Sequence, residues 1–146
     1  MGGPLKKITI TFPMLPIPKG RPRARKCSDH VQIFTPPKTK KFEQAIAEYY
    51  KQSTKAFRFD KDQPIIVNLV FGMPIPKSAP KSRQQAMAQG ILRHTKRPDV
   101  DNLIKSMLDA LNGVAWVDDS QIVKLSASKE YSSEPYIYLY IHESVD

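Results

Sequence analysis

Five aspartates stand between Pro98 and Asp119, and Lys105 is the only basic residue among them. Short carboxylates are held rigidly and suit a hard, geometrically demanding cation such as Mg²⁺. Converging carboxylates repel one another unless a cation neutralises them or some are protonated. The stretch therefore predicts a divalent-metal site for Mg²⁺, with Mn²⁺ as the second choice and one or two ions per site.

Asp99 and Asp101 are the first two candidate ligands. In an extended segment, residues two apart project to the same side. Either Asp101 or Asn102 can cap the helix that is predicted to follow, and a cap needs only one side chain. Asp99 is then left without a structural purpose, which favours a role in the chemistry.

Asp119 is the third candidate ligand, at the start of a predicted strand. It shares parity with Val123 and Leu125, the apolar side that should pack on the helices, whereas Asp118 shares parity with the solvent side. We therefore expect Asp119 to point inward. A turn residue that merely starts the strand is the alternative.

The chemistry that this residue set favours is phosphodiester hydrolysis. Bound divalent ions activate water and stabilise the leaving oxygen. Lys105 could stabilise negative charge that develops on the phosphate. Its alternative role is an ordinary ion pair with Asp101 or Asp109 on the polar face of a helix.

Basic residues are concentrated elsewhere in this chain of 146 residues and formal charge +9. Eight lie between Lys19 and Lys41, and six lie between Lys77 and Arg97, where no acidic residue occurs. Basic, proline-bearing loops can bind a phosphate backbone and release counterions, although solvated loops are the alternative. The residues that we expect to contact DNA are Lys19, Arg21, Arg23, Arg25, Lys77, Arg93, Lys96 and Arg97.

Hydrophobic periodicity predicts the elements that must position these side chains. Alternating or β-branched runs predict four strands, at 6–12, 64–72, 119–129 and 135–142. Helical spacing predicts two main helices, at 38–56 and 102–112, and allows a short third at 80–90. The proline-rich stretch 13–37 should form extended loops. We expect an α+β fold in a single domain over 1–146, with two main helices packed on a mostly antiparallel four-stranded sheet.

Other classes of protein are disfavoured. Cys27 is the only cysteine, so an internal disulfide is excluded and a zinc cluster is not expected. No apolar run approaches the length of about 18 residues that a membrane span needs. The first residues lack the apolar core of a secretion signal. We expect a cytoplasmic protein without a membrane partner.

The chain resembles the RusA family of Holliday-junction resolvases in several motifs. They are KRPDVDNLIK (96–105), DALNG (109–113) and WVDDSQI (116–122), together with PKGRPR (18–23) and MPIPK (73–77). The resemblance implies a homodimeric, Mg²⁺-dependent endonuclease of bacterial or phage origin that nicks two opposed strands of a four-way DNA junction. It also implies that Asp99, Asp101 and Asp119 are the catalytic carboxylates and that Lys105 is a functional lysine.

Two other functions stay open from the sequence. A non-catalytic DNA-binding or architectural protein would use the aspartates only as caps and turn residues. A small metal-dependent phosphatase would act on a soluble phosphoester and would not need so many positive charges in its loops.

Overall fold

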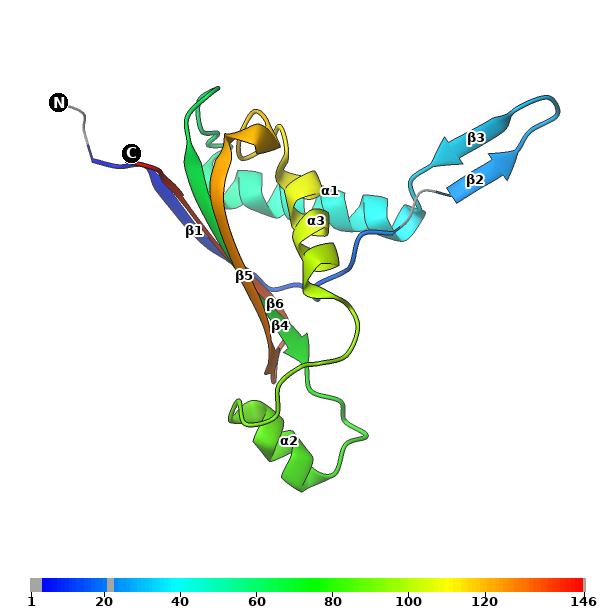
Figure 1. Cartoon of the computed structure of the whole chain (residues 1–146), viewed down its shortest axis with the longest axis vertical. Helices are drawn as coiled ribbons and strands as arrows, with labels where there is room; N and C mark the ends of the chain where they lie inside the picture. Colours follow the sequence, from blue (N-terminus) through cyan, green and yellow to red (C-terminus); the bar gives the residue numbers. More distant parts are fainter. Residues whose placement is uncertain (1–3, 21–22, 146) are drawn as a thin grey trace.

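A four-stranded sheet forms the centre of the fold (Figure 1), in a computed structural model that describes residues 4–20 and 23–145. The sheet order is β1-β6-β4-β5. The strands are β1 (Lys7–Phe12), β4 (Ile65–Pro74), β5 (Ile122–Ser132) and β6 (Tyr136–Glu143). All four predicted strands are confirmed, and the apolar run of β4 lies inside the sheet.

The sheet is mixed rather than wholly antiparallel. Strand β6 pairs antiparallel with β1 and β4, whereas β4 and β5 pair in parallel. Parallel neighbours need a crossover connection, and the chain between β4 and β5 supplies it through helices α2 (Lys81–Ala88) and α3 (Val100–Leu111). The α+β class is confirmed, and the expectation of a mostly antiparallel sheet holds for β1, β6 and β4 but not for β5.

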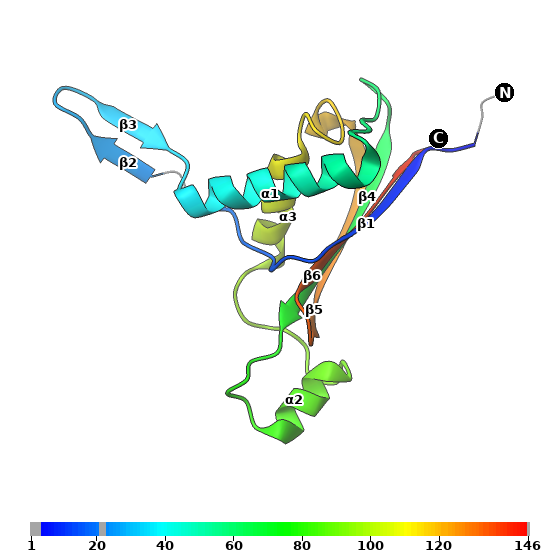
Figure 2. The same ribbon diagram turned by 180° about the vertical axis from the view of Figure 1, so that it is seen from behind.

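Two main helices cover one face of the sheet, α1 (Pro37–Thr54) and α3 (Figures 1 and 2). Helix α1 ends earlier than predicted because Lys55 and Ala56 adopt left-handed backbone angles, with φ of 55° and 59°. Helix α3 buries Leu103, Met107 and Leu111 in the core. The allowed third helix exists as α2, beyond the end of the sheet. None of the helices in the described ranges has the length and hydrophobicity of a bilayer-crossing segment.

The proline-rich stretch differs from the expectation of extended loops alone. Within it, β2 (Arg23–Lys26) and β3 (Val31–Phe34) pair as an antiparallel hairpin. Prolines flank the hairpin but none lies between residues 23 and 35, so every backbone N–H needed for pairing is present. The hairpin projects from the body of the molecule beyond the first turn of α1 in both views (Figures 1 and 2).

Candidate active site

Asp99 and Asp101 lie at the N-terminal end of α3. The helix begins at Val100, so Asp99 is the N-cap residue, with extended backbone angles, and Asp101 lies in the first turn. The expectations that Asp101 or Asn102 caps the helix and that both aspartates share an extended segment are therefore wrong. The Asp99 side chain makes no capping hydrogen bond. The Asp101 side chain accepts a hydrogen bond from the backbone N–H of the next residue, Asn102 (2.9 Å). Both residues are exposed, so the start of the helix presents two carboxylates to solvent.

An open pocket of about 710 Å³ lies beside Asp99. Its wall includes Lys19 and Arg97, two of the predicted DNA-binding residues, and also Asn102. The side-chain amide of Asn102 donates to the carbonyl oxygen of Lys19 (3.3 Å), which joins the segment before β2 to α3. The pocket therefore combines a free carboxylate with cationic residues, a composition suited to a phosphate and a metal cation together.

Lys19 is held between two helices. Its ammonium forms ion pairs with Asp109 of α3 (3.1 Å) and Glu43 of α1 (3.3 Å). Burial lowers the pKa of Lys19, but the hydrogen bonds and negative charges of Asp109 and Glu43 outweigh it and leave the pKa raised. Next to it, Gly20 donates its backbone N–H to the hydroxyl of Thr39 (3.0 Å), and a Cβ at Gly20 would lie 2.4 Å from that oxygen. Lys19 thus faces the pocket as a fixed cation whose charge is already partly neutralised.

Lys129 of β5 holds the segment that leads into the Asp-x-Asp pair. Its ammonium donates to the carbonyl oxygens of Lys96 (2.6 Å) and Pro98 (2.9 Å). Hydrogen bonds from a charged donor are stronger than neutral ones. Strand β5, at the edge of the sheet, therefore fixes the position of the backbone that leads into Asp99, although Asp99 and Lys129 are 30 positions apart in the sequence.

Asp118 and Asp119 have different roles at the other end of α3. Asp118 caps a short 3₁₀ helix, Asp119–Gln121, and accepts the backbone N–H of Ser120 (3.0 Å). Hydrogen bonds from the Ser120 side chain and backbone lower the pKa of Asp118. Asp119 instead accepts a hydrogen bond from the indole N–H of the fully buried Trp116 (2.7 Å). Asp118 is therefore a structural residue, and Asp119 is the half-buried carboxylate.

The environment of Asp119 disfavours its charged form. Burial raises the pKa of Asp119, the Trp116 hydrogen bond opposes this rise, and the charges of Asp109 and Asp118 add to it. The strand-parity reason for expecting an inward Asp119 is wrong. Asp119 precedes β5, and a bulge at Val123 breaks the alternation, since Ile122 pairs with Ile65 and Lys124 with Ile66. Val123 is 60% exposed.

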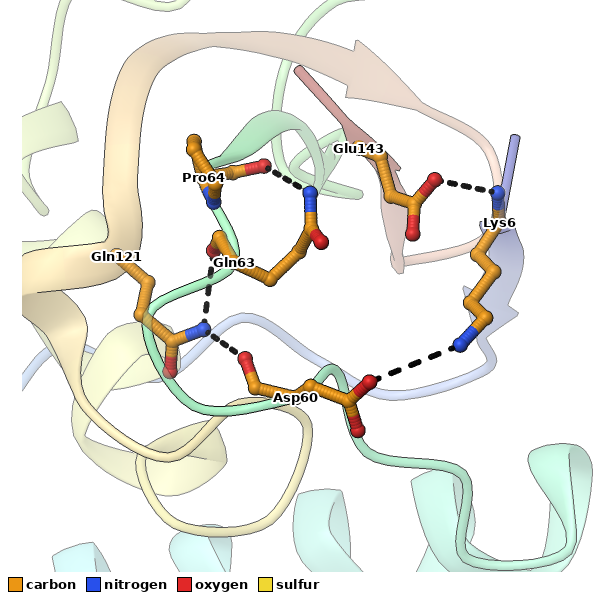
Figure 3. Close-up of polar contacts among 6 residues, drawn as sticks. All are labelled: Lys6, Asp60, Gln63, Pro64, Gln121 and Glu143. Atoms are coloured by element: carbon orange, nitrogen blue, oxygen red, sulfur yellow. Dashed lines mark hydrogen bonds and ion pairs between the residues drawn. The ribbon is translucent and has the colours of Figure 1, made fainter. Parts of the chain in front are cut away.

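Gln121 joins this loop to the rest of the molecule (Figure 3). Its side-chain oxygen accepts the backbone N–H groups of Val117 (2.7 Å) and Asp118 (3.0 Å). Its side-chain nitrogen donates to the carbonyl oxygens of Asp60 (2.7 Å) and Gln63 (3.0 Å). A buried side chain with every polar atom bonded makes the 116–121 loop a rigid support for Asp119.

The predicted carboxylates do not converge within one chain. In the described ranges, no three His, Cys, Asp or Glu side chains lie close enough together to hold a metal ion. Asp119 lies near Asp109, and Asp101 is eight residues earlier on α3, a distance of about 12 Å along a helix. Asp99 and Asp101 offer the hard oxygen donors that Mg²⁺ prefers. They fit part of a metal site, and the assignment of Asp119 as a further ligand stays a prediction.

Two comparisons with known proteins bear on this site. The family model described as endodeoxyribonuclease RusA matches residues 13–142. The chain belongs to the RusA family of endodeoxyribonucleases. A protein of Bacillus subtilis (strain 168), named "Uncharacterized protein YqaN", is 36% identical over 130 residues, which cover 88% of this chain and 90% of that protein.

The basic residues expected to serve this RusA-family nuclease lie in several parts of the structure. Lys19 and Arg97 line the pocket beside Asp99, whereas Arg25 lies on the β2–β3 hairpin. Lys77 and Arg93 lie in the loops on either side of α2 and line other pockets. Arg21 and the side chain of Arg23 lie outside the described residues. DNA contact by these residues stays a prediction, as does a role for Lys96, whose carbonyl oxygen accepts the Lys129 bond.

Two residues that matter to this RusA-family site were missed in the sequence. Lys129 was not singled out, yet it has the same parity as Ala127 on the helix-facing side of β5, where a lysine needs a buried or bonded role. An ion pair of Lys105 with Asp101 or Asp109 was the alternative role for that lysine, and the structure instead pairs Asp109 with Lys19. The strand pattern therefore contained the information needed to single out Lys129. The partner of Asp109 could not be read from the sequence, because it depends on how the 18–20 segment crosses α3.

Proposed function

We propose that this chain is a Mg²⁺-dependent endonuclease that resolves four-way DNA junctions by paired symmetric nicks. The observation that carries the proposal is the open pocket where exposed Asp99, next to Asp101, lies beside Lys19 and Arg97 in a chain of the RusA family. A single nuclease domain over 1–146 stays a prediction.

Each part of the pocket has a chemical task in this proposal. Asp99 and Asp101 would hold the Mg²⁺ ion, which when bound supplies activation of water and stabilisation of the leaving oxygen. Arg97 binds and orients a phosphate from the pocket wall, because its guanidinium offers a fork of donors. Lys105 is exposed one turn beyond Asp101, where its ammonium can stabilise charge that develops on the phosphate.

A homodimer is the second part of the proposal. A four-way junction presents two equivalent scissile phosphates, and a two-fold symmetric dimer supplies two identical sites. The described residues of one chain contain no three-carboxylate cluster, which supports a dimer in which Asp119 of one copy approaches the Asp99–Asp101 pair of the other. Burial and, to a smaller extent, the charges of Asp109 and Asp118 raise the pKa of Asp119, and a cation bound there would offset both effects.

Mixing two inactive variants tests where the third carboxylate comes from. If each site uses carboxylates from both copies, a heterodimer of Asp101→Asn and Asp119→Asn has one intact site and regains single-strand nicking. If each site lies within one copy, both sites of that heterodimer are defective and the mixture stays inactive. The two variants mixed only after the DNA is bound serve as the control for subunit exchange.

The function itself is tested with a synthetic four-way junction. In Mg²⁺, the protein should give paired nicks at symmetric positions, whereas matched duplex and single-stranded DNA stay uncut. Asp101→Asn should bind the junction and not cut it, because binding rests on the basic residues. Intact junction after incubation with protein and Mg²⁺ would contradict the proposal.

A non-catalytic DNA-binding protein is the second candidate. The absence of a three-carboxylate cluster in the described part of a single chain favours it. It predicts the same junction affinity with and without Mg²⁺ and no hydrolysis in either condition, so the same assay separates the two functions.

A further inference from the structure

The β2–β3 hairpin is a two-stranded arm that extends away from the sheet and its helices (Figures 1 and 2). Arg23 pairs with Phe34, and Lys26 pairs with Val31, across its four-residue strands. An isolated two-stranded hairpin is marginally stable in water. We therefore expect contact with a binding partner to stabilise the arm.

The two faces of the arm differ in chemistry, because side chains alternate along each strand. On one face, Arg25 donates to the side-chain oxygen of Gln32 (2.7 Å), and its guanidinium lies 5.6 Å from the centre of the Phe34 ring. The opposite face carries Ala24, Val31 and Ile33 with Lys26. Val31 is 62% exposed and Ile33 is 71% exposed. One face is thus polar and internally bonded, and the other is apolar and uncovered.

The charge of the arm favours DNA as the occupant of the apolar face over a second copy of this basic chain. The strands contain three basic residues and no acidic one. The one acidic residue near the strands, Asp29, lies in the turn, where its side-chain oxygen is hydrogen-bonded to the ring of His30 (2.9 Å). Val31 and Ile33 have no donors or acceptors that could read base edges. Aliphatic side chains of this kind pack instead against base faces where stacking is broken.

In the open form that a four-way junction adopts without Mg²⁺, base stacking is interrupted at the branch point. We propose that the arm places Val31 and Ile33 against the unstacked bases at the branch point, while Arg25 and Lys26 contact the flanking phosphates. The proposal rests on the proposed junction function and adds a recognition element that is separate from the Asp99 pocket. It gives the protein a contact that a fully stacked duplex does not offer, in addition to the phosphate contacts that both forms of DNA provide.

The test uses a junction with 2-aminopurine at the branch point, whose fluorescence rises when the base unstacks, with Mg²⁺ left out so that the DNA stays intact. Wild-type protein should raise the fluorescence, and Ile33→Thr should lose at least half of that rise. Threonine is β-branched and keeps the strand propensity of the site. Junction affinity should fall by about tenfold, the cost of exchanging one well-packed aliphatic group for a hydroxyl, with duplex affinity unchanged. Val145→Thr is the matched control, because Val145 is also 71% exposed but lies near the C-terminus.

Each outcome decides the matter. If Ile33→Thr and Val145→Thr both behave as wild type, the arm does not contact the branch point and the proposal is wrong. If Ile33→Thr instead changes the oligomeric state measured by light scattering, the apolar face contacts a second copy and the proposal is also wrong. A wild-type protein that raises the fluorescence but never nicks the junction in Mg²⁺ contradicts the nuclease function and leaves the arm proposal standing.

Discussion

The segments at the two ends of α3 both contain aspartates, but these aspartates differ in exposure and in their hydrogen-bond partners. At the N-terminal end, Asp99 and Asp101 are exposed, and Asp99 makes no capping bond. At the C-terminal end, Asp118 caps a turn and Asp119 accepts the indole N–H of Trp116. A carboxylate becomes available for a ligand when the fold leaves it without a partner, so the N-terminal end is where external chemistry fits best.

The two ends are also held in place in different ways. A single charged side chain, Lys129, fastens the backbone in front of Asp99. The 116–121 loop is fastened by the four hydrogen bonds of Gln121. Changes at the supporting residue Lys129 should therefore alter activity more than stability, and changes at the supporting residue Gln121 should do the reverse.

The largest effect is expected from Asp101→Asn. Removing one charge from the Asp99–Asp101 pair should reduce the junction cleavage rate by about 10³-fold or more, with junction affinity retained. Single-turnover cleavage and a binding titration measure the two quantities. Asp62→Asn is the control, because Asp62 is exposed and has a left-handed backbone (φ 67°) that asparagine also adopts. Equal loss in Asp62→Asn would mean that the loss of cleavage is not specific to the Asp99–Asp101 pair.

Lys129→Met should give the next largest effect. Two carbonyl oxygens lose a charged donor, which costs about 1–2 kcal/mol of stability. A displaced Asp99 should slow cleavage by about tenfold to a hundredfold and raise the Mg²⁺ concentration needed for half-maximal rate.

Lys124→Met on the same strand is the matched control for Lys129, since Lys124 is exposed and no bond from its side chain is present in the described residues. Lys129→Arg should recover part of the rate, because arginine can still donate to both carbonyls. A change in melting temperature without any change in Mg²⁺ dependence would show that Lys129 supports the fold but not the site.

Gln121→Ala should affect stability far more than chemistry. Two partly buried carbonyl oxygens and two backbone N–H groups lose their partner, which should cost about 2–4 kcal/mol. Chemical denaturation measures this cost, with Gln52→Ala on the exposed side of α1 as the control. At temperatures where the variant is folded, cleavage should stay within severalfold of wild type. If the folded variant cleaves the junction far more slowly than this, Gln121 supports the chemistry as well as the fold, which would contradict the proposed difference between Gln121 and Lys129.

The smallest effect is expected from Asp119→Asn in the absence of metal. The pKa of Asp119 is raised in the folded state, so its stabilising contribution is complete below the ordinary value of 3.8 and is lost as the pH rises through the folded pKa. Asparagine still accepts the Trp116 bond but removes the charge near Asp109 and Asp118. The variant should therefore melt slightly above wild type at neutral pH, with the difference vanishing near pH 3. A variant that melts below wild type at pH 7 would argue against repulsion at this end.

Much of the fold could be predicted because the relevant patterns are local. The period-two alternation and the apolar run of 64–72 predicted the strands, and the amphipathic pattern of 102–112 predicted α3. The parallel pairing of β5 could not be predicted, because it depends on the crossover between β4 and β5. The β2–β3 hairpin was missed because its strands are only four residues long and the prolines around them indicate loops.

The residue types alone indicated the chemistry of this protein: a set of aspartates with a lysine, and a positive surface for DNA. Local spacing placed Asp99 and Asp101 together, since they are two residues apart whatever the fold. Only the tertiary structure decided which groups meet across the chain. Lys129 reaches the 96–98 backbone, Asp109 pairs with Lys19, and Asp119 accepts its hydrogen bond from the Trp116 indole. The physical reason is that sheet register and helix packing set these long-range contacts, and neither is encoded in any short window of sequence.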